Sequence, residues 1–314
     1  MKQIISDLIE GKNLTSTQAK FAMENILNDK CSDVEIAAFI TLLRAKGETS
    51  EELSSLVNTM WANMPDFGDV DVTDTIDTCG TGGSLFKTFN ISTAVSFILS
   101  ALDIKVAKHG NRAASSKSGA ADVLEELGYN LNLDPYKAAE LFNEMGFAFL
   151  LAPTFHPGMR HAKNARIELG VRTTFNFIGP LANPFKAPIR LHGVSDYRMV
   201  DKYIDTLKVL GVSRAIVFCS KNSMDEFSIS EITRGKKLVS GVVSDFEFDP
   251  TKFEFEPVDD EDIKGQDPKY NAEILKRVLS GVRCKQRGIV VANAAIGYSL
   301  VKDIGIAEAK IEIE

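Results

Sequence analysis

The sequence predicts an α/β protein, with a small N-terminal all-helical domain and a larger α/β domain whose central mixed, partly parallel sheet is flanked by helices. Residues 1 to about 65 carry only helical patterns, whereas short β-rich runs alternate with helical stretches from "DTIDTCG" (74–80) onward. Such alternation is typical of a sheet with parallel strands. We expect residues 1–68, joined by part of 160–190, to form the small domain and residues 69–314 the large one.

The helical prediction for the small domain rests on three capping boxes. A capping box pairs an N-cap hydroxyl with a Glu or Gln three residues later, and each satisfies a backbone N–H that a helix start leaves free. The pairs are Thr15 with Gln18, Ser32 with Glu35, and Thr49 with Glu52. Apolar residues at helical spacing follow each pair, so three amphipathic helices are expected.

The large domain alternates strand-like and helix-like segments. The predicted strands are "TIDTC", "IKVAKH", "FAFLLAP" and "RAIVFCS", and the predicted helices include "STAVSFILSAL", "SGAADVLEEL", "DPYKAAELFNEM" and "SDYRMVDKYIDTLKVLG". A further helix is predicted over 158–169. The stretch 171–185, which contains two prolines, reads as a connecting segment that packs back on the N-terminal helices. The acidic and aromatic stretch 244–262 reads as a surface excursion.

Composition indicates an ordinary globular protein. Of the 314 residues, 44% are apolar and 25% are charged, and no apolar run approaches the roughly 20 residues of a membrane span. The early charges at the N-terminus are unlike a secretory signal, so we expect a cytoplasmic protein without membrane association. The net charge of −7 counts against nonspecific nucleic-acid binding. Four scattered cysteines, Cys31, Cys79, Cys219 and Cys284, suggest neither a zinc site nor disulfides, and are expected to be reduced and mostly buried.

Glycine and hydroxyl residues gather in "CGTGGSLFKTFNIST" (79–93), between a predicted strand and a predicted helix. Glycines let backbone amides approach an anion closely, and a helix N-terminus adds free N–H groups and a favourable dipole. Asn90, Ser92 and Thr93 fall at the helix start, where the two hydroxyls could simply cap the helix. Taken alone, this glycine cluster is better read as a flexible turn.

A second donor-rich turn lies in "KHGNRAASSKSGAADVLEELG" (108–128), again between an apolar run and a helix. Basic and hydroxyl side chains alternate there: Lys108, Arg112, Ser115, Ser116, Lys117 and Ser118, followed by Gly119. Two such turns after two strands, in an acidic chain, favour a phosphorylated ligand.

Basic residues cluster once more at 156–172, as His156, Arg160, His161, Arg166 and Arg172. Singly, each is best explained as part of a solvated helix face or as a satisfied polar tip. Arg166, however, precedes "ELGVRTTFN", and a planar guanidinium suits a carboxylate. This segment is therefore predicted to hold a small carboxylic acid.

Asp225 and Glu226 are adjacent carboxylates in "NSMDEFSIS". Neighbouring side chains on a strand point to opposite faces, so joint action requires a turn at this point. An exposed acidic pair explains them equally well. Beside a pyrophosphate, however, they would suit Mg²⁺, which is held by one or two carboxylates together with substrate oxygens.

Four blocks in this order and spacing resemble the anthranilate phosphoribosyltransferase family of tryptophan biosynthesis: "GTGG…TFNIST", "KHGNR…SKSGAADVLEELG", "FHPGMRHAKNARIELGVRTTFNFIGPLANP" and "MDE". The resemblance covers residues 1 to about 300 and includes the helical N-terminal unit. It implies a homodimer formed through the small helical domain, a fold shared with pyrimidine-type nucleoside phosphorylases, and Mg²⁺ as cofactor. The implied reaction transfers a phosphoribosyl group from phosphoribosyl pyrophosphate (PRPP) to the amine of anthranilate.

The resemblance also implies site residues. The PRPP-binding residues would be Gly80, Gly82, Gly83, Asn90, Ser92, Thr93, Lys108 and Ser118. The anthranilate-binding residues would be Gly80, His109, Asn111, His156, Arg166, Gly179 and Pro180. The metal ligands would be Ser92, Asp225 and Glu226, and no residue is assigned as a general base.

This chain departs from the family pattern at two places. Ser84, Leu85 and Phe86 follow "GTGG", where the family has Asp and then Gly, and Leu85 and Phe86 are expected to stiffen the loop by apolar packing. The chain also stops soon after "NAAIGYSLV", so part of the outer helical layer is expected to be absent or replaced by the terminal "IEIE".

Two other functions are compatible with the same scaffold. A nucleoside phosphorylase would need neither a carboxylate-binding arginine nor two adjacent metal carboxylates, so Arg166, Asp225 and Glu226 argue against it. A noncatalytic relative that binds nucleic acid would have a basic surface and degraded motifs, whereas this chain is acidic and its motifs are largely intact.

Overall fold

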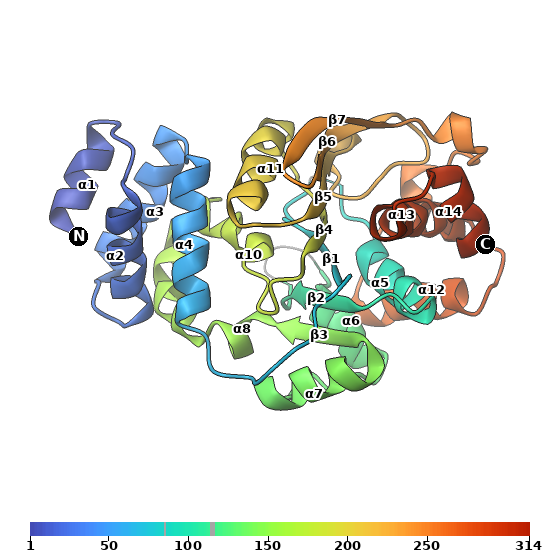
Figure 1. The fold of residues 1–314 in the computed structure, drawn as a ribbon, viewed down its shortest axis with the longest axis horizontal. Coiled ribbons are helices and arrows are strands. Elements are labelled where there is room, and N and C mark those ends of the chain that lie inside the picture. The colour runs from blue at the N-terminus through green and yellow to red at the C-terminus, as the bar shows by residue number, and fades with distance from the viewer. Residues whose placement is uncertain (85, 114–116) are drawn as a thin grey trace.

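A computed structural model describes residues 1–84, 86–113 and 117–314, and the chain begins with four helices at one end of the molecule (Figure 1). They are α1 (Lys2–Ile9), α2 (Ser16–Leu27), α3 (Asp33–Lys46) and α4 (Ser50–Ala62). All three predicted capping boxes form, at the starts of α2, α3 and α4. The N-cap hydroxyls accept hydrogen bonds from the backbone N–H groups of Gln18, Glu35 and Glu52. The helical N-terminal unit is thus confirmed.

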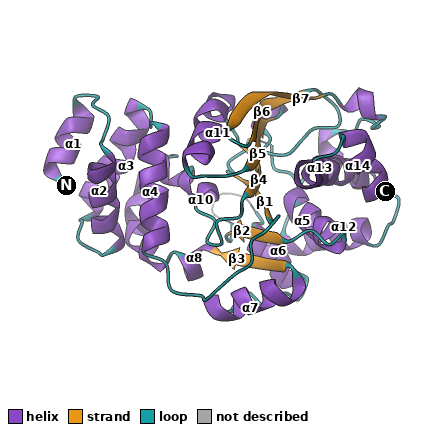
Figure 2. Cartoon of the chain, in the orientation of Figure 1, coloured by secondary structure: helices purple, strands orange, loops and turns teal. Residues whose placement is uncertain are grey.

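The large domain is built on a seven-stranded sheet with the order β3-β2-β1-β4-β5-β6-β7 (Figure 2). The strands are β1 (Ile76–Gly80), β2 (Val106–Gly110), β3 (Phe147–Leu151), β4 (Ile189–Gly193), β5 (Arg214–Cys219), β6 (Thr233–Val239) and β7 (Val242–Phe248). The first five strands are parallel, and β6 and β7 add to them antiparallel. The predicted mixed, partly parallel sheet is confirmed.

Helices cover both faces of this sheet (Figure 1). The α-helices that follow β1 along the chain are α5 (Ile91–Ala101), α6 (Ala120–Glu126), α7 (Pro135–Met145), α8 (Ala152–Phe155), α9 (Lys163–Leu169), α10 (Ile178–Leu181), α11 (Val200–Val209), α12 (Pro268–Leu279), α13 (Lys285–Lys302) and α14 (Ile306–Ile313). Along β5, Ala215 and Val217 join the apolar cluster that includes α11 and the N-terminal helices, whereas Ile216 and Phe218 join the cluster of α5 and α13. The strand is buried on both faces, as parallel sheets require.

The segment between β3 and β4 connects the sheet to the N-terminal helices. Phe175, Phe177 and Ile178 belong to the same apolar cluster as α2, α3 and α4, so the predicted packing of this segment is confirmed. The continuous helix predicted over 158–169 is wrong. A 3₁₀ helix (Pro157–Ala162) precedes α9, and a Cβ added at Gly158 would lie 2.8 Å from the carbonyl oxygen of Leu27. Because Gly158 packs this closely against the end of α2, the segment before α9 is a 3₁₀ helix and not a continuation of the α-helix.

Two further expectations need correction. The stretch 244–262 is not only a surface excursion, because 244–248 lies in edge strand β7 and Phe248, Phe255 and Ile263 are buried. The alternation of buried and exposed side chains that marks a strand is hard to recognise there, because most side chains of this edge strand are exposed.

The four cysteines are unpaired, but each is half-buried rather than buried. The terminal "IEIE" is part of α14 up to Ile313, which packs against α13.

In the described part of the chain, no single helix has both the length and the apolar character of a membrane span. Only α13 and α14 together reach that composition, with a bend of 117° between them, and most residues of α13 are buried inside the protein.

Candidate active site

The carboxyl end of the sheet has a topological switch point between β1 and β4. From β1 the chain continues to β2 and β3 on one side, and later returns to β4 on the other side. In open α/β sheets, ligands bind at the carboxyl ends of the strands beside such a switch. Gly80 ends β1 and Gly193 ends β4, and Asp225 crosses both. A Cβ at Gly80 would overlap the Asp225 carboxylate, and a Cβ at Gly193 would overlap its backbone.

The glycine turn continues from Gly80 over the switch point. Gly82 and Gly83 have φ values of +61° and +75°, the left-handed region that glycine adopts without strain. The Gly82 N–H donates to Asp225 Oδ2 at 2.9 Å. Within the described residues, the backbone N–H groups of Gly83 and Ser84 make no hydrogen bond. The turn therefore offers free amide donors beside a carboxylate.

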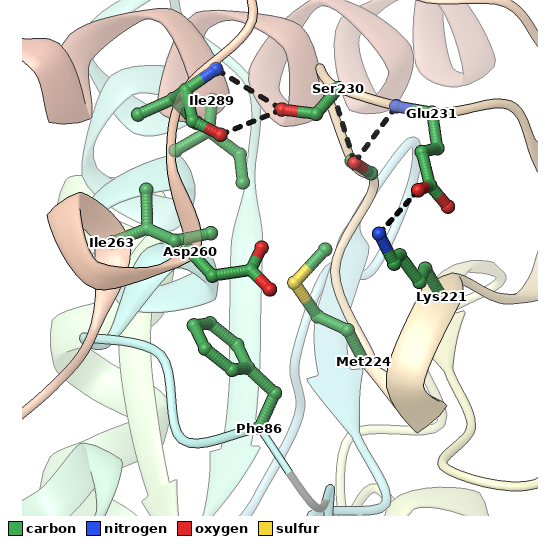
Figure 3. Close-up of a pocket in the computed structure, with 10 residues that line it drawn as sticks. Phe86, Lys221, Met224, Ser230, Glu231, Asp260, Ile263 and Ile289 are labelled. Atoms are coloured by element: carbon green, nitrogen blue, oxygen red, sulfur yellow. Dashed lines mark hydrogen bonds and ion pairs between the residues drawn. The ribbon is translucent and has the colours of Figure 1, made fainter.

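Ser84 and Phe86 anchor the far side of this turn. The Phe86 N–H donates to Ser84 Oγ at 3.1 Å, and Ser84 is buried. Figure 3 shows the Phe86 ring beside Met224 in a small cavity that also includes Ile263 and Ile289. The expected apolar packing is confirmed for Phe86, whereas Leu85 lies outside the described residues, as do Ser115 and Ser116.

The start of α5 and the end of β2 supply polar side chains to the same edge. Lys108 is buried, and its Nζ donates to the carbonyl oxygen of Thr78 at 2.6 Å and to Ser92 Oγ at 3.2 Å. Burial lowers the pKa of Lys108. The Thr93 hydroxyl is buried and finds no hydrogen-bond partner among the described residues. Asn90 Oδ1 accepts from Asn271 Nδ2 at 2.9 Å and from Ser118 Oγ at 3.4 Å.

None of these side chains caps α5. Asn90 is the N-cap residue, yet no side-chain capping hydrogen bond is made at this helix start. The simpler interpretation of Ser92 and Thr93 as caps is therefore wrong. Ser92 Oγ instead accepts a hydrogen bond from Lys108 Nζ of β2.

Asp225 and Glu226 lie in a bend that follows a 3₁₀ turn (Lys221–Ser223). The bend brings the two carboxyl groups close enough for each to shift the pKa of the other, as their joint action requires. Glu226 Oε2 also accepts from Thr88 Oγ1 at 3.3 Å. Burial raises the pKa of both carboxyls, and the neighbouring Asp225 raises that of Glu226 further. Both residues are half-buried, so the interpretation as an exposed acidic pair is wrong.

Two buried histidines form a second group beside this edge. The rings of His109 and His156 lie 5.5 Å apart in an edge-to-face arrangement. His156 Nε2 bonds to the Ala182 carbonyl oxygen at 2.8 Å, whereas His156 Nδ1 and His109 Nε2 have no partner among the described residues. Burial lowers the pKa of His109 to about 3 and that of His156 to about 4, so both rings are neutral.

The remaining residues that the resemblance assigns to anthranilate lie on α9, on α10 and just beyond β2. Gly179 and Pro180 are in α10, and the backbone of Gly179 contacts His109. Arg166 is half-buried on α9, and its side chain makes no hydrogen bond or ion pair with any described residue. Asn111 is exposed beyond β2, where its Oδ1 accepts from the Arg112 N–H. The unpaired guanidinium of Arg166 is thus available to an anion.

The site also includes residues outside the binding sets that the resemblance implied. Gly193 permits the approach of Asp225, and Thr78 and Thr88 hold Lys108 and Glu226. Arg172, one of the clustered arginines, donates to the carbonyl oxygens of Gly82 and Gly83. A glycine ending a second parallel strand is a signal for Gly193, but that strand was not predicted.

Comparisons with known proteins cover nearly the whole chain. Residues 2–64 match the model of the glycosyl transferase family helical bundle domain, and residues 72–312 match that of the glycosyl transferase family a/b domain. The anthranilate phosphoribosyltransferase of Acetivibrio thermocellus is 40% identical over 99% of this chain and 92% of its own length. The chain belongs to the anthranilate phosphoribosyltransferase family. The enzyme of Persephonella marina is 36% identical over 100% of this chain and 93% of its own length.

Solved structures of the anthranilate phosphoribosyltransferase family share this fold. The enzyme of Thermus thermophilus has a TM-score of 0.91 and 30% identity, over 99% of this chain and 93% of its own. The Saccharomyces cerevisiae enzyme in complex with PRPP and Mg has a TM-score of 0.89 and 26% identity, over 99% and 92%. The same yeast enzyme in complex with 4-fluoroanthranilate has a TM-score of 0.88. These relatives agree with the transferase interpretation and not with the phosphorylase or nucleic-acid-binding alternatives.

Proposed function

We propose that this protein transfers the 5-phosphoribosyl group of PRPP to the amine of anthranilate, giving N-(5-phosphoribosyl)anthranilate and pyrophosphate in tryptophan biosynthesis. The observation that carries the proposal is the contact of the glycine turn with Asp225, next to Glu226, over the switch point. Free amide donors and a half-buried carboxylate pair suit a pyrophosphate with its metal ion. That the acceptor is anthranilate is proposed from the chain's membership of the anthranilate phosphoribosyltransferase family.

The donor would lie along the carboxyl edge of β1 and β2. Its proposed ligands are Gly80, Gly82, Gly83, Asn90, Ser92, Thr93, Lys108 and Ser118. Support comes from the free amide of Gly83, the unpartnered hydroxyl of Thr93 and the buried charge of Lys108. Buried polar groups without partners are rare in proteins, so a ligand that pairs with the Thr93 hydroxyl would remove a cost.

The proposed metal is Mg²⁺, held by Asp225, Glu226 and Ser92. The donor set fits, because the two carboxyl groups lie close enough to shift each other's pKa and burial raises the pKa of both. A divalent cation would favour their ionised forms. Mg²⁺ uses one or two carboxylates with substrate oxygens, so the pair needs no third acidic ligand. When bound, the ion supplies charge stabilisation to the pyrophosphate leaving group.

The acceptor would bind between α9, α10 and the end of β2. Its proposed contacts are Gly80, His109, Asn111, His156, Arg166, Gly179 and Pro180. Arg166 has a charge but no partner among the described residues, which suits the anthranilate carboxylate. The neutral rings of His109 and His156 leave one nitrogen each for a polar group of the acceptor.

The chain's own residues would then promote the reaction mainly by position and charge. An aromatic amine is neutral at pH 7, so the attacking nitrogen needs no strong base, and we assign no general base. Arg166 would orient the amine toward C1 of the ribose, which lowers the entropic part of the barrier. The amides of the glycine turn and Lys108 would stabilise the charge that develops on the departing pyrophosphate.

We also propose the organisation of the whole protein. Residues 1–68 with part of 160–190 would form the small domain, and residues 69–314 the large one. A homodimer through the small domain is supported by exposed apolar side chains on its first three helices: Ile9, Phe21 and Val34. A cytoplasmic location without membrane or nucleic-acid partners is supported by the four unpaired cysteines and the acidic net charge of −7.

The test of the proposed function is a fluorescence assay that follows the loss of anthranilate with PRPP and Mg²⁺. We expect turnover that needs both substrates and the metal ion, with pyrophosphate released in equal amount. No turnover at any Mg²⁺ concentration would refute the proposed reaction. Phosphorolysis of a pyrimidine nucleoside in its place would establish the alternative activity.

A further inference from the structure

Arg172 lies outside the proposed PRPP, anthranilate and metal-binding sets, yet it binds two carbonyl oxygens of the glycine turn and one hydroxyl beside it. Its Nη2 donates to the Gly82 carbonyl oxygen at 3.1 Å, and its Nη1 donates to the Gly83 carbonyl oxygen at 3.3 Å and to Ser195 Oγ at 2.6 Å. A Cβ at Gly83 would overlap this guanidinium. We call this set of contacts the Arg172 clasp.

The clasp determines which backbone groups of the turn remain free. The carbonyl oxygens of Gly82 and Gly83 face the guanidinium, and the Gly82 N–H is taken by Asp225. The N–H groups of Gly83 and Ser84 are left without partners among the described residues. Because a peptide unit is planar, holding the Gly82 and Gly83 carbonyls also fixes the directions of these two N–H groups.

The guanidinium of Arg172 also contacts an aromatic side chain that packs on the N-terminal helices. It lies over the Phe177 ring, 4.8 Å from the centroid, and Arg44 of α3 lies over the same ring at 4.6 Å. Arg44 also pairs with buried Glu48 at 3.3 Å, and Glu48 accepts from Thr174 Oγ1 at 2.7 Å. The clasp therefore joins the glycine turn to the helical N-terminal unit through a fixed aromatic platform.

We propose that Arg172 is a positioning residue for phosphoribosyl transfer, which orients the amides of the glycine turn toward the pyrophosphate of PRPP. This inference rests on the proposed function and adds to it a residue outside the binding sets. A lysine cannot replace it, because one ammonium group lacks the planar fork that reaches two carbonyls and a hydroxyl together.

The test compares KM values for the two substrates in Arg172→Ala and Arg172→Lys. We expect both variants to raise the KM for PRPP by about tenfold or more, as loss of charged hydrogen bonds implies, with a much smaller change for anthranilate. Guanidinium ion added at millimolar concentration should partly restore Arg172→Ala, whereas methylammonium should not. Arg160→Ala is the matched control, since Arg160 is exposed and its side chain has no partner among the described residues.

Ser195→Ala separates positioning from direct contact with the donor. Ser195 Oγ binds the guanidinium, so its loss should raise the KM for PRPP in the same direction by a smaller factor. An unchanged KM for PRPP in Ser195→Ala, or equal increases for both substrates in Arg172→Ala, would overturn the proposal. Absence of turnover in the wild-type protein would instead refute the proposed function. Titration of pyrophosphate with Mg²⁺ into each variant by calorimetry, where Arg172→Ala should bind more weakly than Arg160→Ala, tests the clasp without turnover.

Discussion

At the residue scale, the candidate site depends on polar groups that the fold buries. Asp77 of β1 is buried with Arg190 of β4, and their ion pair is 2.9 Å long. The other carboxylate oxygen of Asp77 accepts the His109 N–H at 3.2 Å. Lys108 bonds in turn to Thr78 across the same pair of strands. Side chains thus replace backbone ladder bonds between β1 and β2, beside the proposed donor site.

Arg166 gives the first prediction at this scale. Arg166→Ala should raise the KM for anthranilate by about tenfold or more, because a charged hydrogen bond is typically worth about 1.5 to 3 kcal/mol. The KM for PRPP should change little, since Arg166 is on α9 and not at the glycine turn. Initial rates with each substrate varied in turn give both constants. An equal effect on the two would remove Arg166 from the acceptor site.

His156 gives a prediction about pH. Burial lowers its pKa to about 4 in the folded protein, whereas an unfolded histidine titrates near pH 6.5. Below pH 6.5 the unfolded chain gains a proton that the folded protein does not, so His156 lowers the free energy of unfolding as pH falls. From pH 7 to pH 5 its share of the loss is about 2 kcal/mol.

Urea unfolding of wild type and His156→Gln at both pH values measures this share. The variant should lose less stability than the wild type over the same interval, because glutamine does not titrate. Equal losses of unfolding free energy in the two proteins would show that His156 has the same pKa in the folded and unfolded states.

At the element scale, the sequence predicted helices better than strands. Capping boxes act within four residues, so α2, α3 and α4 could be recognised locally. Strand β4 could not, because its sequence "IRLHG" carries two side chains that are usually exposed. Arg190 is buried there only because Asp77, distant in sequence, is its partner. The bend at Asp225 was likewise left open, since it depends on contact with Gly80 and Gly193.

Gly193 carries the prediction for this scale. Gly193→Ala should reduce kcat/KM by at least tenfold, because its Cβ would displace the Asp225 backbone and move both carboxylates. Gly211→Ala is the stability control, since it places a side chain in open space at a positive φ of +80°, in the turn before the amino end of β5, whereas the site lies at the carboxyl ends of the strands. Full activity in Gly193→Ala, with unchanged dependence on Mg²⁺, would show that Asp225 need not cross β4 this closely.

At the scale of the whole molecule, the helical unit lies at one end and the C-terminus at the other (Figure 1). The candidate site lies between them, where the segment with Arg172 and Phe177 links the unit to the sheet. The four matching sequence blocks predicted the family and a set of candidate site residues. They could not predict the clasp, because its contacts join positions 90 residues apart in the chain.

The exposed apolar residues of the helical unit carry a prediction about assembly. Val34 is 78% exposed on α3, and burying such side chains is a usual source of dimer stability. Val34→Glu should shift the protein from dimer toward monomer in sedimentation equilibrium. Val242→Glu is the matched control, because Val242 is 69% exposed on edge strand β7 of the large domain. A monomeric wild type, or a dimer lost only in the control, would contradict the proposed interface.

The most direct test of the account is the double variant Asp225→Asn with Glu226→Gln, assayed for turnover against Mg²⁺ concentration. The amides keep the shape of the pair and remove its charge, so turnover should be nearly abolished while the fold remains. Thermal stability should be equal to or higher than that of the wild type, because burial raises the pKa of both carboxyls and so penalises their charged forms. Near-normal turnover with the wild-type dependence on Mg²⁺, in a folded double variant, would contradict a metal-bound pyrophosphate at this switch point.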